Sequence, residues 1–171
     1  LWKSTDAGNT WNKVMGGDTQ ASYVSEYNVV EFVSPNLSKT YRYSEASFGP
    51  GVPKDNPIIA DAVLGRDASG DGDNGDGTDK DGCSSFTNAS SLKDKIVVVD
   101  RGTCYFAQKA YNASAAGAKL IIIVNNNQSN PNEIINMGAP SDGSVDLSAI
   151  NVPSIMISYS DGAHLKARLA N

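Results

Sequence analysis

Two short stretches in the second half of the chain are apolar throughout, and they constrain the fold more than any other feature. They read KIVVVD at residues 95–100 and KLIIIVNN at residues 119–126. Between them, Phe106, Ala110 and Ala113 recur at helical spacing over residues 104–116, before a stop at Gly117. Because strands that are apolar on both faces are typical of parallel sheets, we predict a parallel pair joined by a right-handed crossover through one helix.

Further runs rich in β-branched and aromatic residues predict strands around this crossover. They lie at residues 23–35, 40–48, 58–65 and 152–159. A last helix is predicted over Asp161–Leu169, with Ser160 as its N-cap. No apolar run approaches the ~20 residues of a membrane span, so we expect no membrane partner.

The first residues of the chain follow a different pattern. Residues 4–11 read STDAGNTW, a turn-rich stretch between aromatic residues that predicts a β-hairpin. Gly16 and Gly17 then read as a short linker. We therefore expect two parts, a hairpin with its linker at residues 1–22 and one α/β domain with a β-rich core at residues 23–171.

Charge and histidine content exclude several classes of function. The net charge of −5 arises within residues 67–82, where six aspartates face one lysine. No basic stripe remains for a phosphate backbone, so nucleic acid is not an expected partner. With His164 as the single histidine, the chain contains no H-E-x-x-H motif, and it has no G-x-S-x-G motif. We expect a non-catalytic domain, in which His164 is a surface or packing residue.

Cys83 and Cys104 are the two cysteines of the chain. A metal site needs about four ligands, and a catalytic thiol needs a partner histidine. A disulfide is therefore the favoured interpretation, and it indicates an oxidising compartment.

The acidic segment allows two interpretations, which stay open. Asp67, Asp71 and Asp73 alternate around a glycine turn as calcium ligands do, but Thr78 stands where an EF-hand has its bidentate glutamate. The segment is either a calcium loop or a solvated loop. No other cofactor is expected.

Arg101 follows the first apolar strand, at the sheet edge where α/β proteins collect ligands. Its guanidinium group is able to hold a carboxylate or a main-chain carbonyl of a ligand. The alternative is a local role, in which Arg101 pairs with Asp100 or caps nearby carbonyls.

Three segments together resemble a known family. They are DGC at residues 81–83, residues 93–126 with the motif DRGTCYF, and residues 150–169 with the motif VPS. This pattern resembles the protease-associated domain. The resemblance implies a β-sandwich or barrel-like core with flanking helices, in a non-catalytic module attached to secreted peptidases. The segments VVEFVSP and ASFGP are most similar to those of bacterial fungalysin-like metallopeptidases, with subtilisin-like proteases next.

The resemblance also implies a contact region and a function. By similarity to peptide-binding members, the candidate residues are Arg101, Gly102 and Thr103, with Asn125 and Asn126 at the end of the adjacent strand. The implied function is to bind peptide or protein substrates, or to regulate access to a separate catalytic domain of the same extracellular polypeptide. The alternative is a structural or calcium-stabilised spacer.

A second resemblance concerns the N-terminal hairpin. Ser4, Asp6, Gly8, Thr10 and Trp11 match the Asp-box pattern of secreted β-proteins. In those proteins the box is a structural hairpin, so it implies no glycosidase activity.

Overall fold

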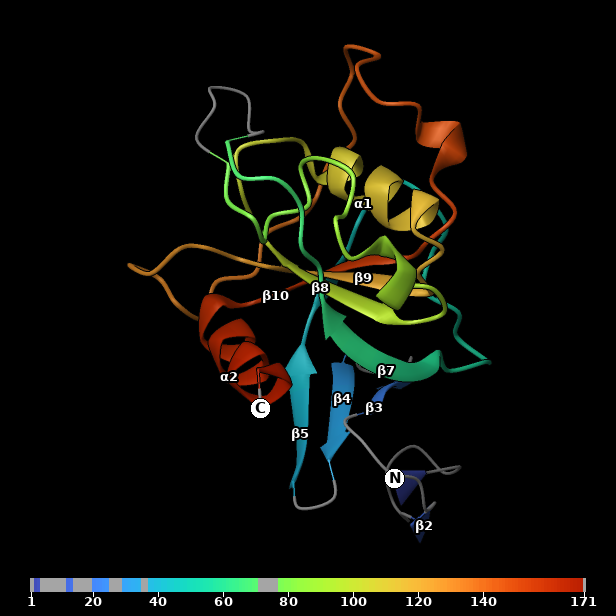
Figure 1. Ribbon diagram of the computed structural model, residues 1–171. Helices are drawn as coiled ribbons and strands as arrows, with labels where there is room; N and C mark the ends of the chain where they lie inside the picture. The colour runs from blue at the N-terminus through green and yellow to red at the C-terminus, as the bar shows by residue number, and fades with distance from the viewer. Residues whose placement is uncertain are drawn as a thin grey trace.

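The computed structural model describes residues 2–3, 12–13, 20–24, 29–34, 37–70 and 77–170 (Figure 1). Strand β1 (Trp2–Lys3) pairs antiparallel with β2 (Asn12–Lys13). These strands flank the predicted N-terminal hairpin. The Asp-box residues of its turn, Ser4 to Trp11, lie outside the described residues.

Eight strands form one mixed sheet in the order β5-β4-β3-β7-β8-β9-β10-β6. Strands β7 to β10 are parallel, β6 pairs antiparallel with β10, and β3, β4 and β5 form an antiparallel meander beside β7. The strands predicted over residues 23–35 and 40–48 are each replaced by two shorter ones. The bounds are β3 (Gln20–Val24), β4 (Val29–Ser34), β5 (Leu37–Arg42), β6 (Ser44–Glu45), β7 (Ile59–Leu64), β8 (Ile96–Asp100), β9 (Leu120–Val124) and β10 (Ser154–Ile157).

The predicted parallel pair, joined through one helix, is confirmed. Strand β8 leads through helix α1 (Phe106–Ala115) to β9, and the two strands pair in parallel from Ile96↔Leu120 to Asp100↔Val124. Helix α1 begins two residues later than predicted because Cys104 is held in a disulfide and Tyr105 is extended, with ψ 144°. Gly117 follows the helix with φ 74°, a left-handed conformation that glycine adopts without a steric penalty.

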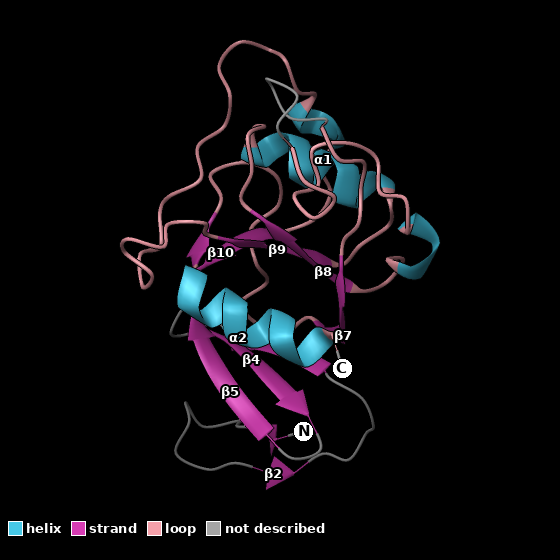
Figure 2. Cartoon of the chain, turned by 60° about the vertical axis from the view of Figure 1, so that its left-hand side comes forward, coloured by secondary structure: helices cyan, strands magenta, loops and turns pink. Residues whose placement is uncertain are grey.

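Two apolar layers cover the central strands. Side chains of successive strand residues point to opposite faces, so Ile96 and Val98 join the layer that contains Leu165 of α2. Val97 and Val99 join the other layer, which contains the buried alanines of α1. Figure 2 shows α1 and α2 on opposite sides of β8, β9 and β10. Both faces are covered, which explains why β8 and β9 are apolar throughout.

Helix α2 (Tyr159–Leu169) begins immediately after β10. Its N-cap is Ser158, whose Oγ accepts a hydrogen bond from the backbone N–H of Asp161 at 3.2 Å. The prediction of Ser160 as N-cap was wrong, because the helix has already started there. The Ser160 hydroxyl instead donates to Asn132 Oδ1 at 2.7 Å. Two short 3-10 helices, η2 (Ala89–Ser91) and η3 (Leu147–Ala149), lie in the connecting segments.

The α/β class, the parallel strands around the crossover and the two helices agree with the sequence-based expectation. The β-sandwich or barrel-like core stays a prediction. Among the described helices, neither the length nor the apolar content reaches what a membrane span requires.

Candidate functional site

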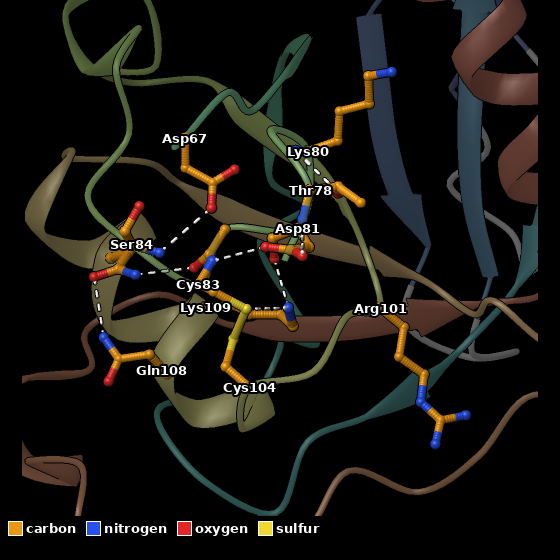
Figure 3. Close-up of a disulfide and its surroundings, with 12 residues drawn as sticks. Asp67, Thr78, Lys80, Asp81, Cys83, Ser84, Arg101, Cys104, Gln108 and Lys109 are labelled. Atoms are coloured by element: carbon orange, nitrogen blue, oxygen red, sulfur yellow. Dashed lines mark hydrogen bonds between the residues drawn. A yellow bond between two sulfur atoms is a disulfide. The ribbon is translucent and has the colours of Figure 1, made fainter. Parts of the chain in front are cut away.

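The Cys83–Cys104 disulfide anchors the loop that follows strand β8. It joins Cys104, at the end of this loop, to the segment Asp81–Cys83, with the two Cα atoms 5.7 Å apart (Figure 3). The loop starts at Arg101, whose backbone N–H donates to the carbonyl of Val124 at 2.7 Å. Residues 101–104 are therefore fixed at both ends. The predicted disulfide is confirmed, and it indicates a non-cytosolic compartment.

The buried carboxylate of Asp81 packs against the backbone of this loop. Asp81 is 1% exposed, and its carboxylate accepts hydrogen bonds from the backbone N–H groups of Thr78 at 2.8 Å and Cys83 at 3.2 Å. The loop backbone passes so close that a Cβ atom on Gly102 would lie 2.6 Å from Asp81 Oδ2. Gly102 is thus needed for close packing, which is a role the sequence-based interpretation did not assign to it.

Helix α1 supplies the other supports. Lys109 is fully buried, and its Nζ donates to the backbone carbonyl of Asp81 at 2.6 Å. Asn112, one turn further along, donates through Nδ2 to the carbonyl of Gly82 at 2.9 Å. Since an unsatisfied ammonium group is costly to bury, these contacts explain how α1 tolerates a lysine on its inner face. The sequence motif includes both residues but does not reveal this support.

Arg101 lies at the carboxyl edge of the parallel strands and is partly exposed. Its Nη1 donates to Asn125 Oδ1 at 3.1 Å, and its guanidinium carbon lies 5.9 Å from the centre of the Phe106 ring. Asp100 forms its ion pair with Lys166 instead. Of the local alternative, the pairing of Arg101 with Asp100 is therefore wrong, whereas the hydrogen bond to the side-chain carbonyl of Asn125 agrees with its second form, the capping of a nearby carbonyl. Figure 3 shows the Arg101 side chain directed away from the disulfide.

The two candidate asparagines after β9, Asn125 and Asn126, have different environments. Asn125 is 1% exposed, and its Nδ2 donates to the carbonyl of Glu133 at 3.1 Å, so it orients Arg101 from within the fold. Asn126 is exposed, and its Nδ2 donates to the carbonyl of Arg101 at 3.3 Å. Thr103 is exposed on the loop itself. The structure thus brings Arg101, Asn125 and Asn126 together, with Thr103 on the same loop.

A tyrosine at the end of the loop extends this surface. Tyr105 is 47% exposed, and its hydroxyl donates to Asp142 Oδ2 at 2.9 Å. Hydrogen bonds from Ser144, followed by the one from Tyr105, lower the pKa of Asp142 below its usual value. The sequence-based interpretation missed this pair because Asp142 belongs to a distant loop with no pattern of its own.

A separate cleft of about 290 Å³ lies between the ends of β7 and β8 and helix α2. The charged residues in it are already paired: Arg66 donates to Asp79 at 3.0 Å, and Lys166 pairs with Asp100. Arg101 does not line this cleft. The lining residues are Leu64, Gly65, Arg66, Lys80, Val98, Val99, Asp100, Lys166 and Ala170.

Of the three candidate calcium ligands, the structure describes only Asp67. It is 4% exposed, and its carboxylate accepts from the backbone N–H of Ser84 at 3.3 Å. Asp71 and Asp73 lie outside the described residues. The part of the chain that the structure describes contains no group of three side chains suited to hold a metal ion.

His164 on α2 packs against the sheet meander. Its Nδ1 lies 2.6 Å from the hydroxyl oxygen of Tyr41 on β5. Burial is the main cause that raises the pKa of Tyr41 to about 12, so the phenol keeps its proton and shares a hydrogen bond with the imidazole, whose tautomer sets which group donates. This contact agrees with the expected packing role of His164.

The fold and the loop together define a mixed α/β module that carries a disulfide-anchored loop at the carboxyl edge of a parallel sheet. The PA domain family model matches residues 58–165, which include strands β7 to β10, helix α1 and both cysteines. The chain belongs to the PA domain family. This module is generally a non-catalytic accessory in proteases and sorting receptors.

Relatives and solved structures agree with this assignment. Vacuolar-sorting receptor 2 of Arabidopsis thaliana is 30% identical over 172 residues, covering 94% of this chain and 25% of the receptor. Signal peptide peptidase-like 2 of the same plant is 38% identical over 92 residues, covering 54% of this chain and 16% of that protein. The chain therefore spans a quarter or less of the length of these two relatives.

The same fold occurs in a bacterial enzyme. The aminopeptidase from Aneurinibacillus sp. strain AM-1 superposes with a TM-score of 0.53 at 23% identity, over 88% of this chain and 29% of that enzyme. At this identity the likeness concerns the fold alone.

Proposed function

We propose that this chain is a peptide-binding accessory domain of a larger secreted protein, and that the loop Arg101–Thr103 with Asn125 and Asn126 contacts the peptide. The observation that carries the proposal is the position and pairing of the Arg101 side chain. Its guanidinium group is oriented by Asn125, while Asp100 is held by Lys166. A guanidinium group presents five N–H donors in a planar fork, which suits carboxylate or main-chain carbonyl oxygens of a peptide.

The names of the relatives support the proposal that this domain binds a protein or peptide partner. A region 30% identical to this chain occurs in a protein named as a vacuolar-sorting receptor, and a receptor must bind a partner. The exposed residues around Arg101 are also suitable, because Thr103 and Asn126 offer polar groups and Tyr105 offers an aromatic surface. Aromatic and arginine side chains are enriched at protein interfaces.

For the larger protein, we propose a secreted peptidase in which this domain binds substrate or regulates access to the catalytic domain. The segments similar to bacterial fungalysin-like metallopeptidases support this choice. A sorting receptor is the second candidate, favoured by the receptor relatives. The coding sequence on either side decides between them, because an H-E-x-x-H motif would identify the peptidase.

We also propose that the sheet closes into a barrel-like core. Strands β5 and β6 stand at the two ends of the sheet order, yet only Tyr43 separates them in sequence. One continuous segment therefore borders both edges, which supports the barrel-like closure that the family resemblance implies. We also propose that an Asp-box-like hairpin precedes the PA domain. The boundary expected between residues 22 and 23 lies within β3, whose residues Gln20–Ser22 pair with β7, so these residues belong to the larger domain.

A peptide-binding assay tests the proposed function. The purified chain is titrated against a library of fluorescein-labelled peptides by fluorescence anisotropy, first as wild type and then as Arg101→Ala. We expect saturable binding that weakens about tenfold or more in the variant, which corresponds to a lost charge-assisted hydrogen bond. The melting temperature should stay within about 2 °C, since Arg101 makes a single hydrogen bond through its guanidinium in the described structure.

Arg42→Ala is the matched control. Arg42 is an exposed arginine at the end of β5, so its removal changes the net charge equally without touching the loop. Its binding should equal that of the wild type. A wild-type chain that binds no peptide would support the structural spacer instead, and equal losses in both variants would mean that net charge, not the loop, governs binding.

A further inference from the structure

The two sulfur atoms of the disulfide lie in different environments. Cys83 is 8% exposed, whereas Cys104 is partly exposed on the loop that precedes α1. The Nζ atom of the fully buried Lys109 lies 3.4 Å from Cys83 Sγ (Figure 3). Cys83 is thus a buried residue beside an ammonium group, and Cys104 is the more exposed of the two cysteines.

This asymmetry matters because thiol–disulfide exchange depends on access and on the leaving group. The attacking thiolate must reach one sulfur in line with the bond, and the reaction is faster when the departing thiolate is well stabilised. Cationic neighbours stabilise thiolates strongly. Access therefore favours attack at Cys104, and the ammonium group of Lys109 favours departure of Cys83.

The Asp81 carboxylate forms hydrogen bonds elsewhere, and the positive end of α1 also favours attack at Cys104. The carboxylate of Asp81, which would disfavour a thiolate, accepts from two backbone N–H groups, those of Thr78 and Cys83. Lys109 is the charged group whose nitrogen contacts the sulfur itself. Cys104 stands just before the positive end of α1, which attracts an incoming anion.

We propose that Cys104 is the site at which small thiols, such as reduced glutathione, form a mixed disulfide with this domain. The external thiolate forms a bond to Cys104 Sγ, the bond between Cys104 and Cys83 breaks, and its electron pair stays on Cys83 as a thiolate held by Lys109. A second thiolate then displaces Cys104 from the mixed disulfide. Two external thiols are oxidised to one disulfide, and the protein disulfide is reduced to two cysteines.

The exchange has a structural consequence for the loop. Once the bond opens, the covalent tie between Cys104 and the segment Asp81–Cys83 is lost. The loop keeps the strand contact of Arg101, and the segment keeps its hydrogen bonds from Lys109 and Asn112 of α1. This step rests on the proposed function: peptide binding would weaken in a reducing environment and persist in an oxidising one. The site of exchange itself does not depend on peptide binding.

The first experiment locates the mixed disulfide on the wild-type chain. The folded protein is exposed briefly to reduced glutathione, free thiols are blocked with N-ethylmaleimide, and tryptic peptides are identified by mass spectrometry. We expect the glutathione adduct on the peptide with Cys104 and the maleimide adduct on the peptide with Cys83. An adduct mainly on Cys83 would overturn the proposal.

The second experiment tests the role of Lys109 with Lys109→Gln. We expect reduction of the disulfide by glutathione to be slower by about fivefold, because the leaving thiolate loses its cation. Asn112→Ala is the control, since it removes a hydrogen bond from α1 to Gly82 without removing the charge. A purely structural role of Lys109 predicts the opposite, because a loosened fold exposes the disulfide and speeds its reduction.

An unchanged or faster rate in Lys109→Gln would therefore overturn the assigned role. Should this variant fail to fold, the adduct position on the wild-type chain still decides the proposal. Neither measurement involves a peptide, so a failure here is distinguishable from a failure of the proposed function.

Discussion

Asp100 forms its ion pair with Lys166 of helix α2 and not with the adjacent Arg101. The two paired side chains are 26% and 30% exposed, so the pair connects the end of β8 to α2 close to the surface. This connection separates two tasks at the edge of the sheet. Asp100 holds helix α2 through its ion pair with Lys166. Arg101 is oriented by its hydrogen bond to Asn125, as part of the candidate binding surface.

Replacing Lys166 tests this separation. We expect Lys166→Met to lower the free energy of unfolding by about 1 kcal/mol, as for a partly exposed ion pair, when measured by urea denaturation. Asp100 then becomes available to Arg101, so peptide binding should weaken a few-fold. Lys119→Met removes an exposed lysine and serves as the control, with neither change expected. A Lys166 variant that binds peptide like the wild type would show that Asp100 does not compete for Arg101.

The close approach of Gly102 to Asp81 makes a second prediction. A Cβ atom on Gly102 would lie 2.6 to 2.8 Å from three atoms of the Asp81 side chain, which is itself held by two backbone N–H groups. We expect Gly102→Ala to lower the free energy of unfolding by about 2 kcal/mol, the usual cost of an over-packed site.

Gly138→Ala is the matched control for this substitution. A Cβ atom at Gly138 would meet nothing within 4 Å, so the free energy of unfolding should change by less than about 0.5 kcal/mol. Urea denaturation of both variants compares the two sites directly. Equal stability of the two variants would mean that the loop moves away from Asp81 at little cost.

The contact between His164 and Tyr41 predicts a dependence of stability on pH. Burial, followed by the positive charges of Lys39 and Arg168, lowers the pKa of His164 below its ordinary value of 6.5, against the opposing charge of Asp161. The unfolded chain therefore binds a proton more readily than the folded one. The contribution of the neutral imidazole is complete above pH 6.5 and is lost as the pH falls through the lowered pKa.

The variant His164→Asn isolates this contribution. Asparagine keeps an acceptor for the hydroxyl of Tyr41 but does not titrate, so its melting temperature should change less between neutral and mildly acidic pH than that of the wild type. Differential scanning calorimetry across this range measures both curves. Parallel curves would show that His164 has the same pKa in the folded and unfolded chains.

Calcium is expected to leave the stability of the domain unchanged. The carboxylate of Asp67 is buried and accepts a backbone hydrogen bond from Ser84, so it already serves the fold. We predict that millimolar calcium or a chelator shifts the melting temperature by less than about 1 °C, since a ligand that prefers the folded state would raise it. A clear rise with calcium and a fall with chelator would instead favour the calcium-stabilised spacer.

Much of the fold could be predicted from local patterns. The apolar runs that became β8 and β9, together with the helical spacing between them, sufficed for the parallel crossover. The N-cap of α2 was misplaced by two residues because Ser158 and Ser160 both suit that role in sequence. The choice depends on where β10 ends, and the register of the sheet decides that.

The sequence by itself determined which segments are buried on both faces, that Cys83 and Cys104 pair, and that Arg101 follows a central strand. These features depend on residue type and on neighbours along the chain. The tertiary structure alone decided the partners of Asp100 and Arg101, the burial of Lys109 beside one sulfur, and the position of β5 and β6 at the two sheet edges. Such contacts join residues far apart in sequence, so they depend on the path of the whole chain, which no local pattern records.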